Sequence, residues 1–269
     1  FICATGGHVN YWGREADGTD DVRRAVREQH KAGADFIKIM ASGGVADVNE
    51  DPEVTQYTLT ELESMVDAAN EAGTYVAAHA HPATAISLCL QAGVRTIEHA
   101  SFIDERGIEL ALERGAYLVP TFLVYDVMAR SEGLSQAQRD MAAKVLERKA
   151  ASFLAAVEAG VKWGVGTDSG SYLQPGQLWQ ELLLLHDLGI PMSDVLHAAT
   201  VTNAEILRDD AVGRLEPGCW ADAIVLDQDP TIDPGALARP ALVIQGGRVS
   251  EGPARPPTPT QAVLQGGRK

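Results

Sequence analysis

Four polar residues stand at or near the ends of short apolar segments in this chain. They are Lys38 in DFIKIMASGG, His79 in YVAAHAH, His99 in RTIEHAS and Asp168 in VKWGVGTDSG. Each segment is typical of a buried parallel strand, followed by Gly or Ser where the chain turns. The carboxyl ends of parallel strands are where ligands bind. A lysine, two histidines and an aspartate gathered there are the components of a metal site.

Each of these residues has another interpretation when it is taken alone. An unpaired lysine in a core strand is costly, so Lys38 could instead form an ion pair with Asp or Glu in a pocket. A single histidine at a strand end is more often a hydrogen-bonded core residue than a ligand. The four residues together favour the metal site.

The elements that must position these residues alternate between strand-like and helix-like patterns. Strands are expected at 1–5, 35–41, 75–80, 95–100, 117–122 and 161–167, with helices near 20–31, 82–91, 104–114, 135–159, 177–188 and 193–207. The pattern Thr60-Glu61-Leu62-Glu63 is typical of a capping box, and its helix is expected to end at Gly73. Repeated strand–helix units predict a parallel sheet covered by helices, with six of the eight strands of a closed (β/α)₈ barrel.

The pattern changes after residue 208. GRLEPGCWADAIVLDQDP and ALVIQGGRVSEG have the alternation and turn glycines of hairpins, and they predict strands of a small β-domain over 209–252. The remaining residues, 253–269, are rich in proline and are expected to be disordered. The barrel part is therefore assigned to residues 1–208.

Composition limits the partners of the chain. Its 269 residues carry 22 Lys and Arg against 37 Asp and Glu, a net charge of −15. This charge repels phosphates, which argues against nucleic acid and membrane surfaces as partners. Three scattered cysteines without CxxC spacing indicate neither a thiolate zinc site nor a disulfide framework. A cytoplasmic location is expected, with a leader upstream of Phe1 left open.

In these motifs the chain resembles the amidohydrolase superfamily, in particular its imidazolonepropionase-like and Xaa-Pro dipeptidase-like members. The matching segments, in the order of the family, are GADFIKIMASGG, VAAHAHPATAISLCLQAGVRTIEHAS, GVKWGVGTDSG, LHAATVTNAEIL and GRLEPGCWADAIVLDQDP. The resemblance implies a (β/α)₈ TIM-type barrel with a small β-sandwich domain. It also implies an enzyme that hydrolyses amide or peptide-like C–N bonds, in dipeptides such as Xaa-Pro, N-acyl amino acids or cyclic amides.

The resemblance implies a role for each polar residue. CO₂ would carboxylate Lys38, and the carbamate would bridge two divalent metal ions, with zinc favoured and manganese or cobalt open. His79 and His99 would bind one metal, and Asp168 would bind the other. Asp168 would also take a proton from the attacking hydroxide and pass it to the leaving amine, as general base and then acid. Lys38 and Asp168 are thus the expected catalytic residues.

One part of the family's pattern is absent from its place. A His-x-His motif should end the first barrel strand and precede Lys38, but this chain has none there. His79-Ala80-His81 has the right form, but it follows the lysine, and its spacing to His99 assigns His79 to the fifth strand. The first two strands and the opening half of the β-domain are therefore expected upstream of Phe1, in a segment that would partner this chain, with a natural short form as the alternative. Without that motif, one metal is expected to bind well and the second weakly.

Four further residues are candidates for substrate contact, each with packing or solvation as the alternative. His8 lies in a Gly-rich loop, His81 follows His79 by two residues, and Tyr57 and Tyr125 lie where loops of the family line the pocket. Other functions also stay open: a deaminase, a carbamate or ester hydrolase on the same metals, or a non-catalytic scaffold that kept the shape alone. A homo-oligomer is expected.

Overall fold

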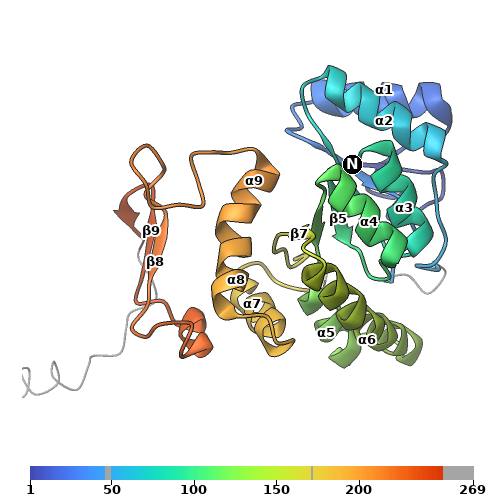
Figure 1. The fold of residues 1–269 in the computed structure, drawn as a ribbon. Helices are drawn as coiled ribbons and strands as arrows, with labels where there is room; N and C mark the ends of the chain where they lie inside the picture. The colour runs from blue at the N-terminus through green and yellow to red at the C-terminus, as the bar shows by residue number, and fades with distance from the viewer. Residues whose placement is uncertain (46–49, 171, 251–269) are drawn as a thin grey trace, which may run out of the picture.

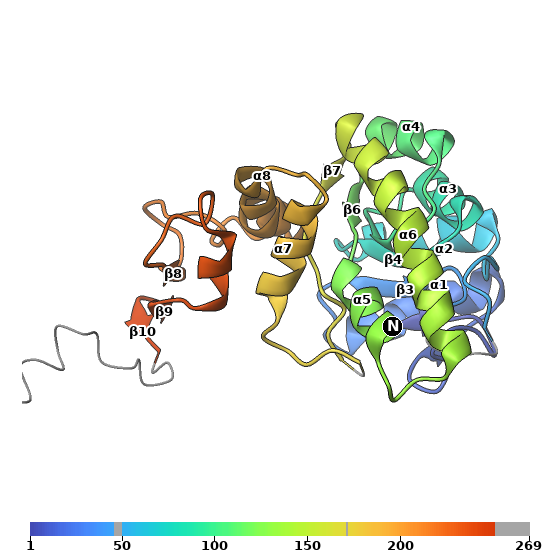
Figure 2. The same cartoon turned by 90° about the horizontal axis from the view of Figure 1, so that it is seen from below.

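The computed structural model describes residues 1–45, 50–170 and 172–250 (Figures 1 and 2). Seven parallel strands form its main sheet in the order β2-β1-β3-β4-β5-β6-β7. The strands are β1 (Ile2–Cys3), β2 (Arg14–Glu15), β3 (Ile37–Met40), β4 (Val76–Ala80), β5 (Thr96–His99), β6 (Tyr117–Val119) and β7 (Lys162–Trp163). The predicted α/β class is confirmed, and β2 is an additional strand. In the described ranges β2 and β7 are the edges of the sheet, so the barrel does not close.

Helices cover one face of this sheet, as Figure 2 shows from below. The helices in the described ranges are α1 (Gly18–Lys31), α2 (Leu59–Glu71), α3 (Ala83–Ala92), α4 (Glu105–Arg114), α5 (Phe122–Arg130), α6 (Gln136–Glu158), α7 (Leu178–Asp187), α8 (Met192–His197) and α9 (Asn203–Leu207), with a π-helical turn at Ala198–Thr202. Of these, α7, α8 and α9 lie between the main sheet and the C-terminal sheet (Figure 1). Ile37, Ile39 and Ile97 are buried in the core between the sheet and the helices. Because side chains alternate along a strand, Lys38 and His79 face the opposite side, the interior of the incomplete barrel.

Two predicted boundaries were wrong for local reasons. The capping box of α2 uses Thr58 and Glu61, because the Glu61 carboxylate accepts the Thr58 amide at 2.9 Å and the helix already begins at Leu59. The strand predicted over 117–122 ends at Val119. Thr121 has a left-handed backbone with φ of 52°, and α5 begins directly after it.

The strand predicted over 161–167 is only two residues long. β7 lies at the edge of the sheet and pairs with β6 alone. Beyond it, the side chain of Asn203 takes the place of a neighbouring strand: its Oδ1 accepts the Val165 amide at 3.0 Å, and its Nδ2 donates to the Val165 carbonyl at 2.9 Å. The segment that leads to Asp168 is therefore held by a helix residue.

A second, antiparallel sheet lies beyond α7–α9, at the far end of the molecule from α1 (Figure 1). Its strands are β8 (Ala223–Val225), β9 (Leu242–Gln245) and β10 (Arg248–Val249), in the order β10-β9-β8. Gly246 and Gly247 have φ of 56° and 76°, which allows the two-residue turn between β9 and β10. The predicted limits 1–208 and 209–252 stay predictions, and the predicted tail lies outside the described residues.

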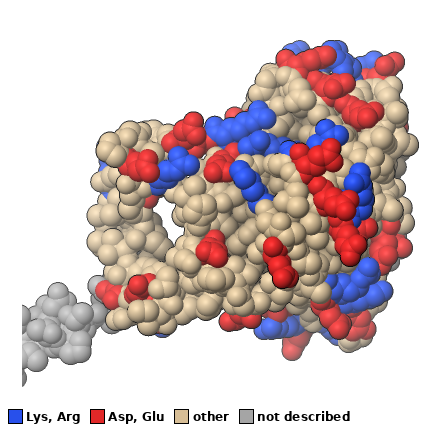
Figure 3. Space-filling model, viewed as in Figure 1, with Lys and Arg blue, Asp and Glu red and all other residues tan. Residues whose placement is uncertain are grey.

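Charged side chains of both signs are interspersed over the helices on the face in Figure 3, whereas the surface of the C-terminal sheet there is mostly uncharged. No helix in the described ranges is long and apolar enough to cross a membrane.

Candidate active site

A cavity opens at the carboxyl ends of the strands of the main sheet. Seven of the eight predicted site residues line it, and they come from several strands, loops and a helix: His8, Lys38, His79, His81, His99, Tyr125 and Asp168. Apolar and aromatic side chains complete the wall, among them Trp12, Met40, Val45, Val124 and Met128. The structure thus places together residues that lie up to 160 positions apart in the sequence.

Three histidines form the floor of this cavity. The ring centroids of His79 and His99 are 4.6 Å apart, and His81 lies 4.7 Å from His79 and 5.0 Å from His99. Burial lowers the pKa of each ring well below its usual 6.5, and neighbouring positive charges lower it further. All three are therefore neutral imidazoles near pH 7, the form in which histidine binds a metal.

Each histidine is oriented through one of its ring nitrogens. His79 Nε2 lies 3.0 Å from the carbonyl of Gly43, His81 Nδ1 lies 2.7 Å from Ser101 Oγ, and His99 Nδ1 lies 2.8 Å from Thr121 Oγ1. A neutral His79 must donate to the carbonyl, which leaves Nδ1 as its lone-pair nitrogen. Such outer hydrogen bonds are typical of metal-binding histidines, because they fix the ring and its tautomer.

Three residues in or next to the cavity have a left-handed backbone conformation. His99, Thr121 and Asp168 have φ of 69°, 52° and 56°, although none of them is glycine. By simple alternation His99 would share the helix-facing side of Ile97, but it lines the cavity instead. Residues in this region cost energy, and they concentrate where function requires a particular direction.

Lys38 lies within β3 and lines the same cavity. Burial lowers the pKa of its ammonium, although the charges of Glu98 and Asp168 oppose that shift. A lowered pKa increases the share of neutral amine, which is the form that reacts with CO₂.

The donor set can be tested against a metal ion. Among the described residues, no three His, Cys, Asp or Glu side chains are placed to hold a metal. His81 has its remaining nitrogen 3.5 Å from the Tyr125 hydroxyl, whereas His79 and His99 each keep one ring nitrogen for a metal, so the third donor would come from Lys38. The residues therefore fit a metal when Lys38 supplies an anionic oxygen, as a carbamate does.

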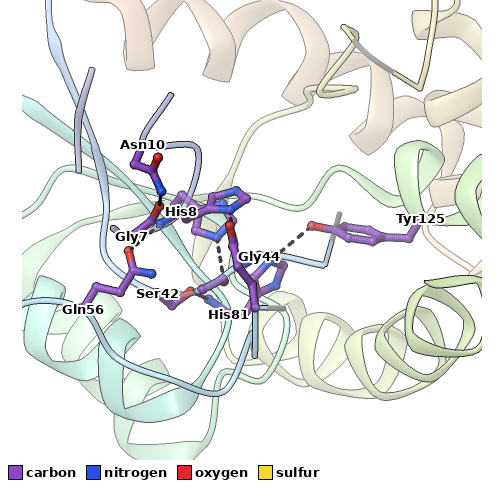
Figure 4. A network of polar contacts seen from close by, with 11 residues as sticks. Gly7, His8, Asn10, Ser42, Gly44, Gln56, His81 and Tyr125 are labelled. Atoms are coloured by element: carbon purple, nitrogen blue, oxygen red, sulfur yellow. Dashed lines mark hydrogen bonds and ion pairs between the residues drawn. The ribbon is translucent and has the colours of Figure 1, made fainter. Parts of the chain in front are cut away.

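His8 closes one side of the cavity. Its ring packs on His79 with centroids 4.4 Å apart, and its Nδ1 lies 2.6 Å from Glu50 Oε2, which also accepts the Gly44 amide at 2.8 Å. Figure 4 shows Gly44 beside the ring of His8, and a Cβ at this glycine would collide with that ring. Glycine is therefore required here for the loop to approach the histidine.

The two tyrosine candidates have different positions. The hydroxyl of Tyr125, on α5, points at His81 Nε2 at 3.5 Å (Figure 4), and its ring lines the cavity. Tyr57 does not line it. Its buried hydroxyl donates to the Ala16 carbonyl at 3.1 Å, so the structure places Tyr57 in the packing between the loop before α1 and the start of α2.

Sequence reasoning missed several residues around the site. Thr121 and Ser101 orient histidines, and Trp12 lines the cavity with 65% of its surface exposed. Lys149 is fully buried on α6. A signal for it existed, because Lys149 falls on the apolar face that Val145 and Phe153 define at helical spacing.

Comparison with known proteins agrees with this arrangement. The model of the amidohydrolase family matches residues 1–252. The chain belongs to the amidohydrolase family. Members of this family are generally metal-dependent, which agrees with the histidine-lined cavity.

Individual relatives are similar over most of this chain. An ochratoxinase from Aspergillus niger is 32% identical over 254 residues, which are 90% of this chain and 52% of that protein. A solved Xaa-Pro dipeptidase with bound methionine in its active site has a TM-score of 0.85 and 33% identity, over 93% of this chain and 66% of that one. A prolidase complexed with N-methylphosphonate-L-proline has a TM-score of 0.81 and 36% identity, over 89% and 60%. The chain spans about half the length of the ochratoxinase.

Proposed function

We propose that this chain carries the active site of a metal-dependent hydrolase that cleaves amide or peptide-like C–N bonds. The observation that carries the proposal is the meeting of His79 from β4, His99 from β5 and Asp168 from the segment after β7 in the cavity that Lys38 lines. The similarity to an ochratoxinase, a dipeptidase and a prolidase supports this reaction class.

Each side chain of the site has its own proposed role. Lys38, as its carbamate, together with His79 Nδ1 and His99 Nε2, would hold a divalent metal, with zinc the first choice. Bound metal would supply a water nucleophile active near neutral pH and polarise the scissile carbonyl. Asp168 lies at the exposed rim of the cavity, where it can take a proton from water and return it to the leaving amine.

The lining favours amides with apolar side chains. Trp12, Val45 and Met128 offer apolar contact, and the hydroxyl of Tyr125 and the ring of His81 offer polar groups that can orient a carbonyl. We therefore propose Xaa-Pro dipeptides and N-acylated hydrophobic amino acids as the substrate class.

Metal content and product analysis test the proposal. The purified protein is supplied with Zn²⁺, Mn²⁺ or Co²⁺ and bicarbonate, and is then assayed with Met-Pro and N-acetylphenylalanine. Release of the free amino acids with at least one metal per chain is expected. Metal below about 0.2 per chain would favour a non-catalytic scaffold, because catalysis of this type needs a bound ion. Ammonia release without cleavage would indicate a deaminase.

Lys38→Ala tests the carbamate. We expect loss of both metal and activity, with partial recovery of both when a small carboxylic acid is added. Lys162→Ala is the control, because Lys162 is an exposed strand lysine that does not line the cavity. Full activity in Lys38→Ala would contradict the assigned role.

A further inference from the structure

Two charged residues are buried behind the histidines and take no part in the proposed reaction. Lys149 on α6 and Glu181 on α7 both have 0% of their surface exposed. Burying a charged group is costly unless it makes specific contacts. Their contacts converge on one short segment, residues 121–125, which follows β6 and begins α5.

Glu181 holds the start of α5. One of its carboxylate oxygens accepts the Phe122 amide at 2.7 Å, and the other accepts the Leu123 amide at 2.6 Å. The first amides of a helix have no partner within the helix, and a negative charge there is favourable. Glu181, from a different helix, therefore fixes the direction in which α5 leaves the strand.

Lys149 holds the residue just before α5. Its Nζ donates to the Thr121 carbonyl at 3.5 Å and lies 4.5 Å from the ring centroid of Tyr125 and 5.1 Å from that of Phe122. Its partners here are two aromatic rings and one carbonyl, and the nearby charge of Glu181 also attracts it. The left-handed Thr121 is thus held at its carbonyl by Lys149, while Glu181 holds the two amides that follow.

Thr121 connects this arrangement to the proposed metal site. Its Oγ1 lies 2.8 Å from His99 Nδ1. A neutral His99 with its proton on Nδ1 donates to Thr121, and its Nε2 lone pair is then free for the cavity. A Thr121 that relaxed from its left-handed backbone, with φ of 52°, would turn its hydroxyl away from the ring.

We propose that Lys149 and Glu181 are positioning residues: they hold Thr121 in its left-handed conformation, and Thr121 in turn sets the tautomer and direction of His99. The inference rests on the proposed function in that His99 is the metal ligand. Neither Lys149 nor Glu181 lines the cavity. Thr121 is the residue that contacts both Lys149, through its carbonyl, and His99, through its hydroxyl.

The tautomer of His99 is the first readout, and it needs no metal. In metal-free protein, ¹⁵N shifts of the histidine rings are expected to show the Nδ1–H form of His99. Thr121→Val and Lys149→Met should each give a mixture of tautomers, whereas Thr121→Ser, which keeps the hydroxyl, should resemble the parent. Lys144→Met is the matched control, because Lys144 is exposed on the same helix. An unchanged tautomer in Lys149→Met would overturn the proposal.

A double-mutant cycle is the second readout. If Lys149 acts through Thr121, then Lys149→Met should weaken Zn²⁺ binding about tenfold in the parent and have little further effect in Thr121→Val. Full additivity would overturn the proposal. If Lys149→Met does not fold, Lys149→Gln, which keeps a neutral donor, takes its place in the cycle. A parent that binds no Zn²⁺ would refute the proposed function, and the tautomer readout would still decide the role of Lys149.

Discussion

At the scale of single residues, the site depends on neutral histidine rings whose orientation is fixed by hydrogen bonds. The three histidines are kept neutral by burial, and each has one nitrogen anchored by a carbonyl or hydroxyl. Asp168 differs from them, because it is exposed at the rim of the cavity. Substitution of a histidine is therefore expected to affect metal binding, whereas substitution of Asp168 is expected to affect proton transfer.

Asp168→Asn should separate these two roles. The amide keeps the shape of the side chain but cannot act as a base, so kcat should fall by about 10²-fold or more, the usual contribution of a positioned base. The metal held by Lys38, His79 and His99 should remain. Metal analysis beside steady-state kinetics checks this, and Ser169→Ala, at the neighbouring cavity position, is the control. Loss of all metal in Asp168→Asn would contradict the division of roles.

Tyr57→Phe should affect stability and leave catalysis unchanged. The substitution removes the buried hydrogen bond to the Ala16 carbonyl and should lower the free energy of unfolding by about 1–2 kcal/mol. KM and kcat should stay at their parent values, because Tyr57 does not line the cavity. Tyr125→Phe is the comparison and should change KM or kcat. An altered KM in Tyr57→Phe, measured beside urea denaturation, would restore Tyr57 as a substrate contact.

At the scale of elements, a helix residue supports the last strand of the sheet. β7 has one strand neighbour, and the side chain of Asn203 supplies the hydrogen bonds on its free side at Val165. A Cβ at Gly164 would collide with the Asn203 side chain, so the close approach also requires that glycine. The position of Asp168 depends on this contact three residues upstream.

Asn203→Ala should loosen the segment that carries Asp168. Two backbone groups of Val165 lose their partner, which should cost about 2–3 kcal/mol of unfolding free energy and lower kcat. Hydrogen exchange at Val165 should become faster than at Ile97 in the centre of the sheet. Asn70→Ala, an exposed position near the end of α2, should change neither quantity. Equal exchange in the parent and Asn203→Ala would rule out this support.

At the scale of the whole molecule, the buried histidines connect stability to pH. Their pKa values are lowered on folding, so below about pH 6.5 the unfolded chain binds more protons than the folded one. The contribution of these histidines to the free energy of unfolding is therefore complete above pH 6.5. It decreases as the pH falls below that value, because the folded state keeps its histidines neutral. Each histidine contributes at most about 1.4 kcal/mol per pH unit.

This dependence can be measured on metal-free protein. Urea denaturation at pH 7.5 and 5.5 should show a lower free energy of unfolding at pH 5.5. His81→Asn should reduce that difference, whereas His30→Asn, at an exposed position on α1, should leave it unchanged. If the free energy of unfolding changes with pH by the same amount in both variants, the buried ring of His81 does not cause the pH dependence.

Much of this protein was determined by its sequence alone. The alternation of apolar segments and helical patterns predicted the parallel sheet, because strand and helix periods are local properties. Polar residues at strand ends predicted the cavity, because parallel strands bring those ends to one edge. Lys38, His79, His99 and Asp168 were therefore found before any contact was known, while their metal and carbamate stay a proposal.

Other features were decided only by the tertiary structure. Residues far apart in the chain meet where Asn203 hydrogen-bonds Val165 and where Lys149 and Glu181 hold the segment that begins at Thr121. The structure also places Tyr125 at the cavity and Tyr57 outside it. No local pattern encodes them, because they depend on which side chains meet after the elements have packed. The left-handed turn at His99 is of the same kind: alternation places its side chain in the core, and tertiary contacts turn it to the cavity.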